Sequence, residues 1–460
     1  MPAEKPANAQ LWAKGLPLDE VIHRFTVGDD AALDLVLVCH DAIGSAAHAR
    51  MLASVGLLDE MDSKALVAEL KLIRDQAQAG AFTITVEQED CHTAIEAHLT
   101  AKLGEAGRRI HLGRSRNDQV ILALRLFYRD ALLDIGGGIA ALAQSFLDFS
   151  AANKHVMMPG YTHLRRAMPS TFGLWGAAFA EGLLEELEAL QALYARLDKC
   201  PLGSAAGFGV PLPLDRAFTS ELLGFSTVQL SVVDVQNSRG RHELAILHWI
   251  NSVAFVVEKA LWDLTLYTTE EFGFLSLPDP FTTGSSIMPQ KRNPDVVELL
   301  RGRMAELRGL AHQVEQIAVG LPSNYHRELQ LLKQPVFAAL AKSAEAFSIL
   351  AQVVSGLVVN KEKASAACSD DLFAAQQAFD LVRQGLSFRD AYQAVGKQIQ
   401  AGEFAPDRSR QVPTHLGSSA DLGLDLTQIE LDGQRAWIQG RRTFLAAKET
   451  ALFAIGDTNG

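Results

Sequence analysis

The stretch FGLWGAAFAEGLLEELEALQALY, residues 172–194, decides the fold. Large apolar side chains recur in it every three or four residues, which is the spacing of one face of an α-helix. Residues 246–264 repeat this pattern, so the sequence predicts long helices that pack side by side. The two apolar stripes consist of Phe172, Trp175, Phe179, Leu183, Leu187, Leu190 and Tyr194, and of Ile246, Trp249, Val253, Val257, Leu261 and Leu264.

A third long helix is predicted from Arg116 to Lys154, with a bend expected at Gly136–Gly138. Helices of 30 to 40 residues span roughly 45–60 Å at about 1.5 Å per residue, which favours a long bundle. Strand patterns are scarce, and Phe82–Val86 is the best candidate, so the predicted fold class is mainly α. Loops are expected at Gly104–Asp118, Pro201–Pro213, Leu277–Pro294 and Gly402–Leu424, followed by a helix near Gln434–Phe453.

The width of the apolar stripes fits two arrangements. The side chains either fill an internal core or pack against partner subunits, and periodicity alone does not choose between the two.

Composition limits the classes of partner. The chain has 460 residues and a formal net charge of -12, which gives no overall basic field for nucleic acid or an anionic membrane. Its four cysteines are scattered and lack CxxC or metal-like spacing, which favours a reducing compartment. The first residues lack an apolar signal core, and charge-poor runs such as Ser348–Val359 are shorter than a membrane span. The expected location is the cytoplasm.

The segment GSSIMPQKRNPD, residues 284–295, is the sharpest motif. Glycine and small hydroxyl residues suit a mobile loop, and Asn293 before Pro294 is typical of a helix N-cap followed by proline. Such a loop brings Ser285 and Lys291 close to a helix start, where negative charge is stabilised. The alternative is a plain surface loop that precedes a capped helix.

This segment closely resembles the GSSxMPxKxNPD signature of the fumarase/aspartase superfamily. GRSRNDQ (113–119) and GYTHL (160–164) resemble its other two segments, and EDCH (89–92) resembles its acidic–histidine turn. The resemblance covers about residues 10 to 400. It implies a mainly α, three-domain fold with an N-terminal helical domain (1–112), a central long-helix bundle (113–361) and a small C-terminal helical domain (362–460).

Within the superfamily, the GRSRNDQ form resembles the argininosuccinate lyase family. LPSNYHRELQLLK (321–333) also resembles this family, which keeps a tyrosine, a glutamine five residues later and a lysine eight residues later; Tyr325, Gln330 and Lys333 match. The implied reaction is elimination of arginine from argininosuccinate with release of fumarate, a step of arginine biosynthesis. The alternatives are adenylosuccinate lyase or another lyase of the superfamily, and a catalytically silent structural homologue.

The chemistry of this reaction suits the residues. Removing a proton next to a carboxylate builds up negative charge there, and fixed donors lower the barrier. The candidate donors are Arg116, Asn117, Thr162, Lys291 and Asn293. Lys291 is the natural cation to activate a serine six residues before it.

The resemblance implies further roles. Ser285 exchanges the carbon-bound proton, and His163, oriented by Glu298, acts on the acid side, although these two roles have been assigned either way in such enzymes. Tyr325, Gln330 and Lys333 hold the arginine portion, with His92 close by. No metal or organic cofactor is implied, and the chain is expected to form a homotetramer in which each site draws on three subunits.

Some features weaken these assignments. A lone His163 is more often structural, Arg114 and Arg116 could form a solvated cluster, and Tyr325 could be a helix-face aromatic. His242 and His248 are six residues apart, whereas a helical zinc pair needs four, so this metal site is rejected. The chain departs from the family at Arg165 (usually Gln), at Gly28 (usually Ser, which Thr26 or the Gly28 backbone could replace), in Ser238–His242 and at Leu331–Leu332.

Overall fold

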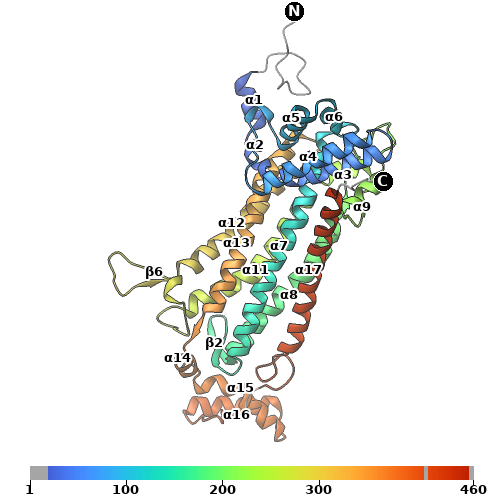
Figure 1. Ribbon diagram of the computed structural model, residues 1–460. Helices are drawn as coiled ribbons and strands as arrows, with labels where there is room; N and C mark the ends of the chain where they lie inside the picture. Colours follow the sequence, from blue (N-terminus) through green and yellow to red (C-terminus); the bar gives the residue numbers. More distant parts are fainter. Residues whose placement is uncertain (1–18, 409–412, 455–460) are drawn as a thin grey trace, which may run out of the picture.

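The computed structural model describes residues 19–408 and 413–454, and it is mainly helical. Long helices stand side by side in a bundle (Figure 1). They are α7 (Arg116–Ala152), α8 (Phe172–Leu197), α11 (Arg241–Tyr267), α12 (Asp295–Ala318) and α13 (Lys333–Gly356). Helix α7 packs on α8 and α13, and α12 packs on α11 and α13. The mainly α class with a central bundle is therefore confirmed.

Both apolar stripes lie in this core. All their side chains are buried except that of Phe179, which is half-buried and packs on the rings of Phe146 and Trp175. The three aromatic residues meet where α7 crosses α8. These stripes therefore fill a core within the chain, which is the first of the two arrangements that the periodicity allowed.

The expected bend at Gly136–Gly138 does not interrupt α7, which continues through these residues. A Cβ at position 136 would lie 2.5 Å from Cδ2 of Leu190 on α8. Gly136 therefore permits the close approach of two helices, and this packing explains the glycine better than a break in the helix.

Shorter helices cover one end of the bundle, and they precede α7 in the chain (Figure 1). They are α1 (Glu20–Val27), α2 (Asp30–Leu33), η1 (Asp34–Val36), α3 (Val38–Ser54), α4 (Glu60–Gln78), η2 (Val86–Gln88), α5 (Cys91–Leu103), α6 (Glu105–Arg108) and η3 (Arg109–His111). The strand predicted at Phe82–Val86 is wrong. Thr85 instead caps η2, and its amide donates to the Gln88 side chain at 2.8 Å.

The described strands form short pairs. The longest is the hairpin of β1 (Met157–Thr162) and β2 (Arg165–Thr171), which the sequence did not predict as strands. The others are β3 (Lys199–Cys200) with β4 (Thr227–Val228), β5 (Leu275–Ser276) with β8 (Val358–Val359), and β6 (Thr283–Gly284) with β7 (Arg292–Asn293). Short elements connect the long helices: α9 (Arg216–Leu222), α10 (Val232–Asn237), η4 (Asp279–Phe281) and η5 (Arg327–Leu332).

The C-terminal part divides between two places. Helices α14 (Lys361–Ala366), η6 (Asp370–Phe373), α15 (Ala374–Arg383) and α16 (Phe388–Ala401) lie at the opposite end of the bundle from α1–α6 (Figure 1). Helix α17 (Leu424–Phe453) returns along α7 and α8, and Glu449 forms an ion pair with Arg74 of α4. The boundaries at 112/113 and 361/362 stay predictions, but α17 packs on the bundle and not with α15 and α16.

Among residues 19–408 and 413–454, three helices are long and apolar enough to cross a membrane by length and composition, namely Arg116–Ala152, Arg241–Tyr267 and Arg327–Gly356. This corrects the expectation that charge-poor runs are too short. Of the most apolar window in each helix, 61, 50 and 50% respectively is buried inside the protein. Packing of these helices on one another and on α8 and α12 accounts for that buried share.

Candidate active site

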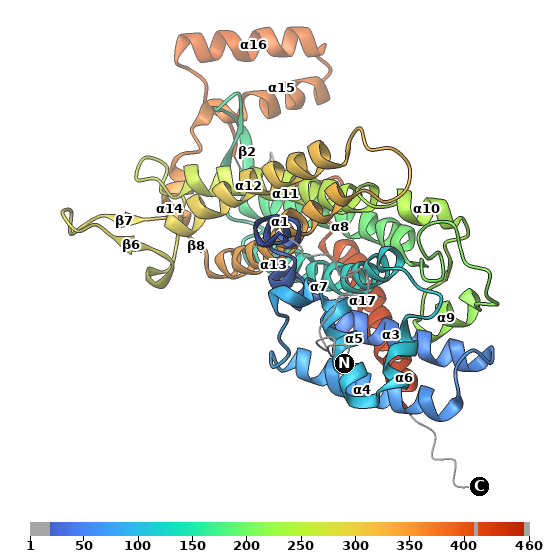
Figure 2. The ribbon, with the colours of Figure 1, turned by 90° about the horizontal axis from the view of Figure 1, so that it is seen from above.

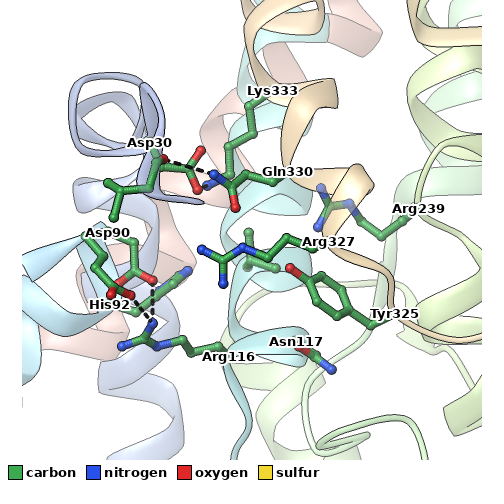
Figure 3. A pocket seen from close by; sticks show the side chains of 13 residues that line it. Asp30, Asp90, His92, Arg116, Asn117, Arg239, Tyr325, Arg327, Gln330 and Lys333 are labelled. Carbon is green, nitrogen blue, oxygen red and sulfur yellow. Dashed lines mark hydrogen bonds and ion pairs between the residues drawn. The ribbon is translucent and has the colours of Figure 1, made fainter. Parts of the chain in front are cut away.

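A pocket lies where the N-terminal helices meet the end of the bundle that they cover (Figure 3). It collects His92, Arg116, Asn117, Tyr325, Gln330 and Lys333, all of which were predicted to bind substrate. The same pocket contains residues that the motifs did not single out as ligands. These are Val27, Asp30, Glu89, Asp90, Val120, Arg239 and Arg327.

Lys333 begins α13 and is buried. Its ammonium lies 2.6 Å from Asp34 and 3.1 Å from Asp30. Burial alone lowers the pKa of Lys333, but the two carboxylates outweigh it and the pKa is raised. Burial raises the pKa of Asp30 to about 6, although Lys333 opposes that shift. Lys333 is therefore a charged group that already joins two acidic residues from α2 and η1 to the bundle.

Gln330 and Arg327 bind the end of α1. The amide of Gln330 donates to the carbonyls of Val27 (2.9 Å) and Thr26 (3.2 Å), and Arg327 donates to Thr26 at 2.8 Å. The hydroxyl of Thr26 donates to His23 at 2.9 Å, within its own helix. Thr26 therefore does not offer a free hydroxyl in place of the family's serine, which leaves the backbone near Gly28.

Arg116 and Asn117 form the first turn of α7, which Ser115 and Asp118 cap. Arg116 lies 3.1 Å from Glu89 and 3.2 Å from Asp90. Burial raises the pKa of Asp90, but His92, Arg116 and hydrogen bonds from Thr93 outweigh it, so the pKa is lowered. The start of a 37-residue helix attracts anions, because its first amides point outward. The Arg116–Asn117 pair is thus suited to a carboxylate.

His92 lies at the inner wall of the pocket (Figure 3). Its Nδ1 is 2.9 Å from a carboxylate oxygen of Asp41, and both side chains are buried. Burial alone lowers the pKa of His92, but Asp41, Asp90 and Asp34 outweigh it and the pKa is raised. The raised pKa favours the cationic form of the imidazole beside the pocket.

Asp34, Cys91 and His92 could be taken for a metal site, since their ligand atoms lie within 4.8 Å of one another. Asp34 is already paired with Lys333, and His92 with Asp41. Burial also raises the pKa of Cys91, which keeps its thiol protonated and a poor ligand. These residues are better suited to an ion-pair network than to a metal.

Arg239 is a buried cation of the pocket that sequence reasoning missed. It donates to the carbonyl of Leu329 at 2.7 Å and forms a 3.3 Å ion pair with Glu243. It therefore fixes η5, the segment that carries Gln330, against α11. Its only sequence signal was its position in the divergent segment Ser238–His242.

Thr162 and His163 lie near the opposite end of the bundle from this pocket, in the β1–β2 hairpin (Figure 1). The turn between the strands consists of His163 and Leu164, whose φ angles are 55° and 56°. Two positive φ values match the two-residue turn that suits the twist of a hairpin. Thr162 and His163 are both exposed.

Ser285 and Lys291 lie in the loop between β6 and β7, which projects from the side of the bundle (Figure 2). The oxygen of Ser285 accepts hydrogen bonds from the amides of Met288 (3.1 Å) and Ile287 (3.3 Å). Lys291 is exposed. The serine oxygen is therefore oriented by two backbone amides, as an activated nucleophile or base requires.

Asn293 is not the helix N-cap that was predicted. It belongs to β7, where it pairs with Thr283, and α12 begins at Asp295 after Pro294 in the cap position. Because Asn293 pairs with Thr283, it lies one residue before the position that caps α12. Glu298, in the first turn of α12, is exposed, and no hydrogen bond or ion pair joins it to His163 within the described part of one chain.

One chain thus presents the predicted residues in three separate places: the pocket, the β1–β2 hairpin, and the β6–β7 loop with the adjoining first turn of α12 (Figure 1). The pocket is rich in both cations and carboxylates, which suits a ligand that carries carboxylates and a guanidinium. The roles given to Ser285, His163, Lys291 and Glu298 stay predictions.

Comparison with known proteins defines the class. The family described as "Lyase" matches residues 16–309, so the chain is a member of this lyase family. Two solved structures share the fold: an EDDS lyase in complex with formate (TM-score 0.80, 23% identity, 95% of each chain) and a Brucella melitensis fumarate lyase:delta crystallin bound to cobalt (TM-score 0.68, 19% identity, 92% of this chain and 93% of that one).

Closer relatives define the particular family. An argininosuccinate lyase from Sorangium cellulosum is 43% identical over 92% of this chain and 99% of its own length. Those from Bacteroides thetaiotaomicron (41%, 92% and 96%) and Stenotrophomonas maltophilia (40%, 90% and 97%) are similar. The chain belongs to the argininosuccinate lyase family.

Proposed function

We propose that this protein cleaves the C–N bond of argininosuccinate to give arginine and fumarate, as a step of arginine biosynthesis. The observation that carries the proposal is the pocket in which Tyr325, Gln330 and Lys333 meet Arg116 and Asn117. These residues come from two distant motifs of the family, and they line one cavity. Identity of 40–43% to argininosuccinate lyases over most of the chain supports the substrate.

The charges of the pocket match those of argininosuccinate. The substrate carries two succinyl carboxylates, one carboxylate on the arginine end, an amino group and a guanidinium. Arg116, Arg327 and His92, whose pKa is raised, suit the carboxylates, whereas Asp30 suits the basic groups. Because both signs are present, a ligand with only one sign of charge would leave part of the pocket unmatched.

The elimination transfers two protons, one from carbon to the base and one from the acid to the departing nitrogen. Lys291 stabilises the deprotonated oxygen of Ser285, which takes the proton from the carbon beside a succinyl carboxylate and becomes a neutral hydroxyl. The electrons of the C–H bond form the double bond of fumarate as the C–N bond breaks. The departing guanidine nitrogen takes a proton from the acid side, where we place His163. The reverse assignment of Ser285 and His163 uses the same groups.

We also propose that the active protein is a homotetramer. The pocket, the β1–β2 hairpin and the β6–β7 loop lie apart on one chain, so a complete site needs segments of several copies (Figure 1). The exposure of Thr162, His163 and Lys291 fits segments that another copy covers. A cytoplasmic location is proposed because the four cysteines are all free.

One assay tests the proposal against its alternatives. Purified protein is offered argininosuccinate and adenylosuccinate separately, and fumarate release is followed by its ultraviolet absorbance. Release from argininosuccinate alone is expected. Release from adenylosuccinate would make the chain a different lyase of the superfamily, and release from neither would make it a silent homologue.

A further inference from the structure

The two faces of the β1–β2 hairpin have different surroundings. Residues directly opposite each other in an antiparallel pair project to the same face, and successive residues along a strand alternate. Tyr161 pairs with Arg166, and Thr162 pairs with Arg165. The first pair therefore shares one face of the hairpin, and the second pair shares the other.

The Tyr161–Arg166 face packs against its own chain. The ring of Tyr161 lies 5.7 Å from that of Phe272 and 6.4 Å from that of Tyr267. The guanidinium of Arg166 donates to the carbonyl of Ala367 at 3.0 Å. These contacts fix the orientation of the hairpin, and therefore the direction of its other face.

The Thr162–Arg165 face points away from the chain. Both side chains are exposed, and so is His163 in the adjoining turn. Arg165 has no hydrogen bond or ion pair to any other described residue, whereas Arg166, its neighbour, is bound. Opposite residues in such a pair have Cβ atoms about 5 Å apart, so the longer arginine side chain extends past the threonine hydroxyl.

We infer that Arg165 is a specificity residue that binds a succinyl carboxylate of the substrate together with Thr162. The inference rests on the proposed function, in which Thr162 is a carboxylate donor and His163 acts on the same ligand. Any surface that receives Thr162 and His163 receives Arg165 as well, because one rigid hairpin face carries them. A guanidinium binds a carboxylate through two parallel N–H donors, which an amide side chain at this position cannot do.

The direct test is equilibrium binding of succinate and of arginine to the full-length assembly, measured by calorimetry. Arg165→Gln should raise the dissociation constant of succinate about tenfold, as expected for loss of one charge-assisted contact. Arginine binding should change by less than twofold. Arg165→Lys should give an intermediate value, since it keeps the charge and loses the fork.

Arg166→Gln is the matched control. It removes the same charge one residue away, on the face that binds Ala367, so succinate binding should stay at the wild-type level. Equal weakening by Arg165→Gln and Arg166→Gln would reduce the effect to general charge and overturn the inference.

Other outcomes also overturn it. If succinate binding is unchanged in Arg165→Gln, or if that variant only dissociates the assembly in size-exclusion chromatography, Arg165 is an interface or surface residue. Wild-type protein that binds no succinate would overturn it too. This test is independent of the fumarate assay. The wild-type protein can release fumarate from argininosuccinate while Arg165→Gln leaves the dissociation constant of succinate unchanged, which would overturn only the inference on Arg165.

Discussion

The pocket, on one side, and the β1–β2 turn and β6–β7 loop, on the other, all contain basic side chains. These side chains are paired with acidic residues in the pocket and exposed in the two loops. In the pocket, Lys333, His92 and Arg116 are bound to acidic residues at 3.2 Å or less. In the loops, His163 and Lys291 are exposed. The difference indicates that the pocket is preorganised within one chain, whereas the candidate catalytic groups of the loops are left exposed by that chain.

The largest expected effect comes from the loops. Ser285→Ala should lower kcat by about 10²–10⁴, the usual contribution of a positioned acid or base. His163→Asn should have a similar effect, while the thermal midpoint stays near wild type because both groups lie outside the core. Ser286→Ala, at the adjacent exposed hydroxyl, is the control and should keep its rate. Near-normal kcat in either variant would remove that residue from its role.

Substitution of Lys333 in the pocket should lower the free energy of unfolding. Lys333→Met leaves Asp34 buried without its 2.6 Å partner, which should cost about 3–5 kcal/mol of unfolding free energy. Urea unfolding measures this loss. The double variant Lys333→Met with Asp34→Asn should recover part of it, because the uncompensated charge is gone. A single variant as stable as wild type would mean that the pair does not hold the N-terminal helices on the bundle.

The sequence predicted the bundle well because buried apolar stripes have the same period as the helix. It missed the β1–β2 hairpin, since Pro159, Gly160 and Pro169 interrupt any alternation and the turn lacks glycine and asparagine. His163 and Leu164 have positive φ, a conformation that sequence alone does not announce for these residue types.

The motifs identified six of the pocket residues, but they did not single out Glu89, Asp90 and Arg327 within them or the pocket residues outside them. Asp30 was missed because its partner Lys333 is 303 residues away, and a single chain offers no local signal for such a pair. Arg239 was missed for the same reason, since its contact with Leu329 spans 90 residues. The candidate site residues on the two loops could be predicted only from their motifs, because the described part of one chain leaves them away from the pocket.

Acid–base behaviour distinguishes the pocket further. The pKa of Asp30 is raised to about 6 from 3.8, so its protonation favours the folded state. The contribution of Asp30 protonation to the free energy of unfolding is fully present below about pH 4, and it is lost as the pH rises through about 6. The free energy of unfolding of Asp30→Asn should therefore rise relative to that of wild type by about 2 kcal/mol between pH 4 and pH 7, after allowance for partial exposure. Urea midpoints at several pH values test this, and a constant difference would contradict it.

The smallest expected effect concerns the hairpin turn. Leu164 is 80% exposed and has a φ of 56°, so its side chain gains little from packing while its backbone pays a steric penalty. Leu164→Gly should relieve that penalty and stabilise the protein by less than about 1 kcal/mol, because glycine also gains freedom in the unfolded chain. Leu164→Asn, which tolerates the same conformation with less unfolded-state freedom, should do at least as well. Thermal midpoints would show both changes; a clear loss in both variants would mean that Leu164 is buried by a partner copy, and that the hairpin is held by assembly as well as by Tyr161 and Arg166.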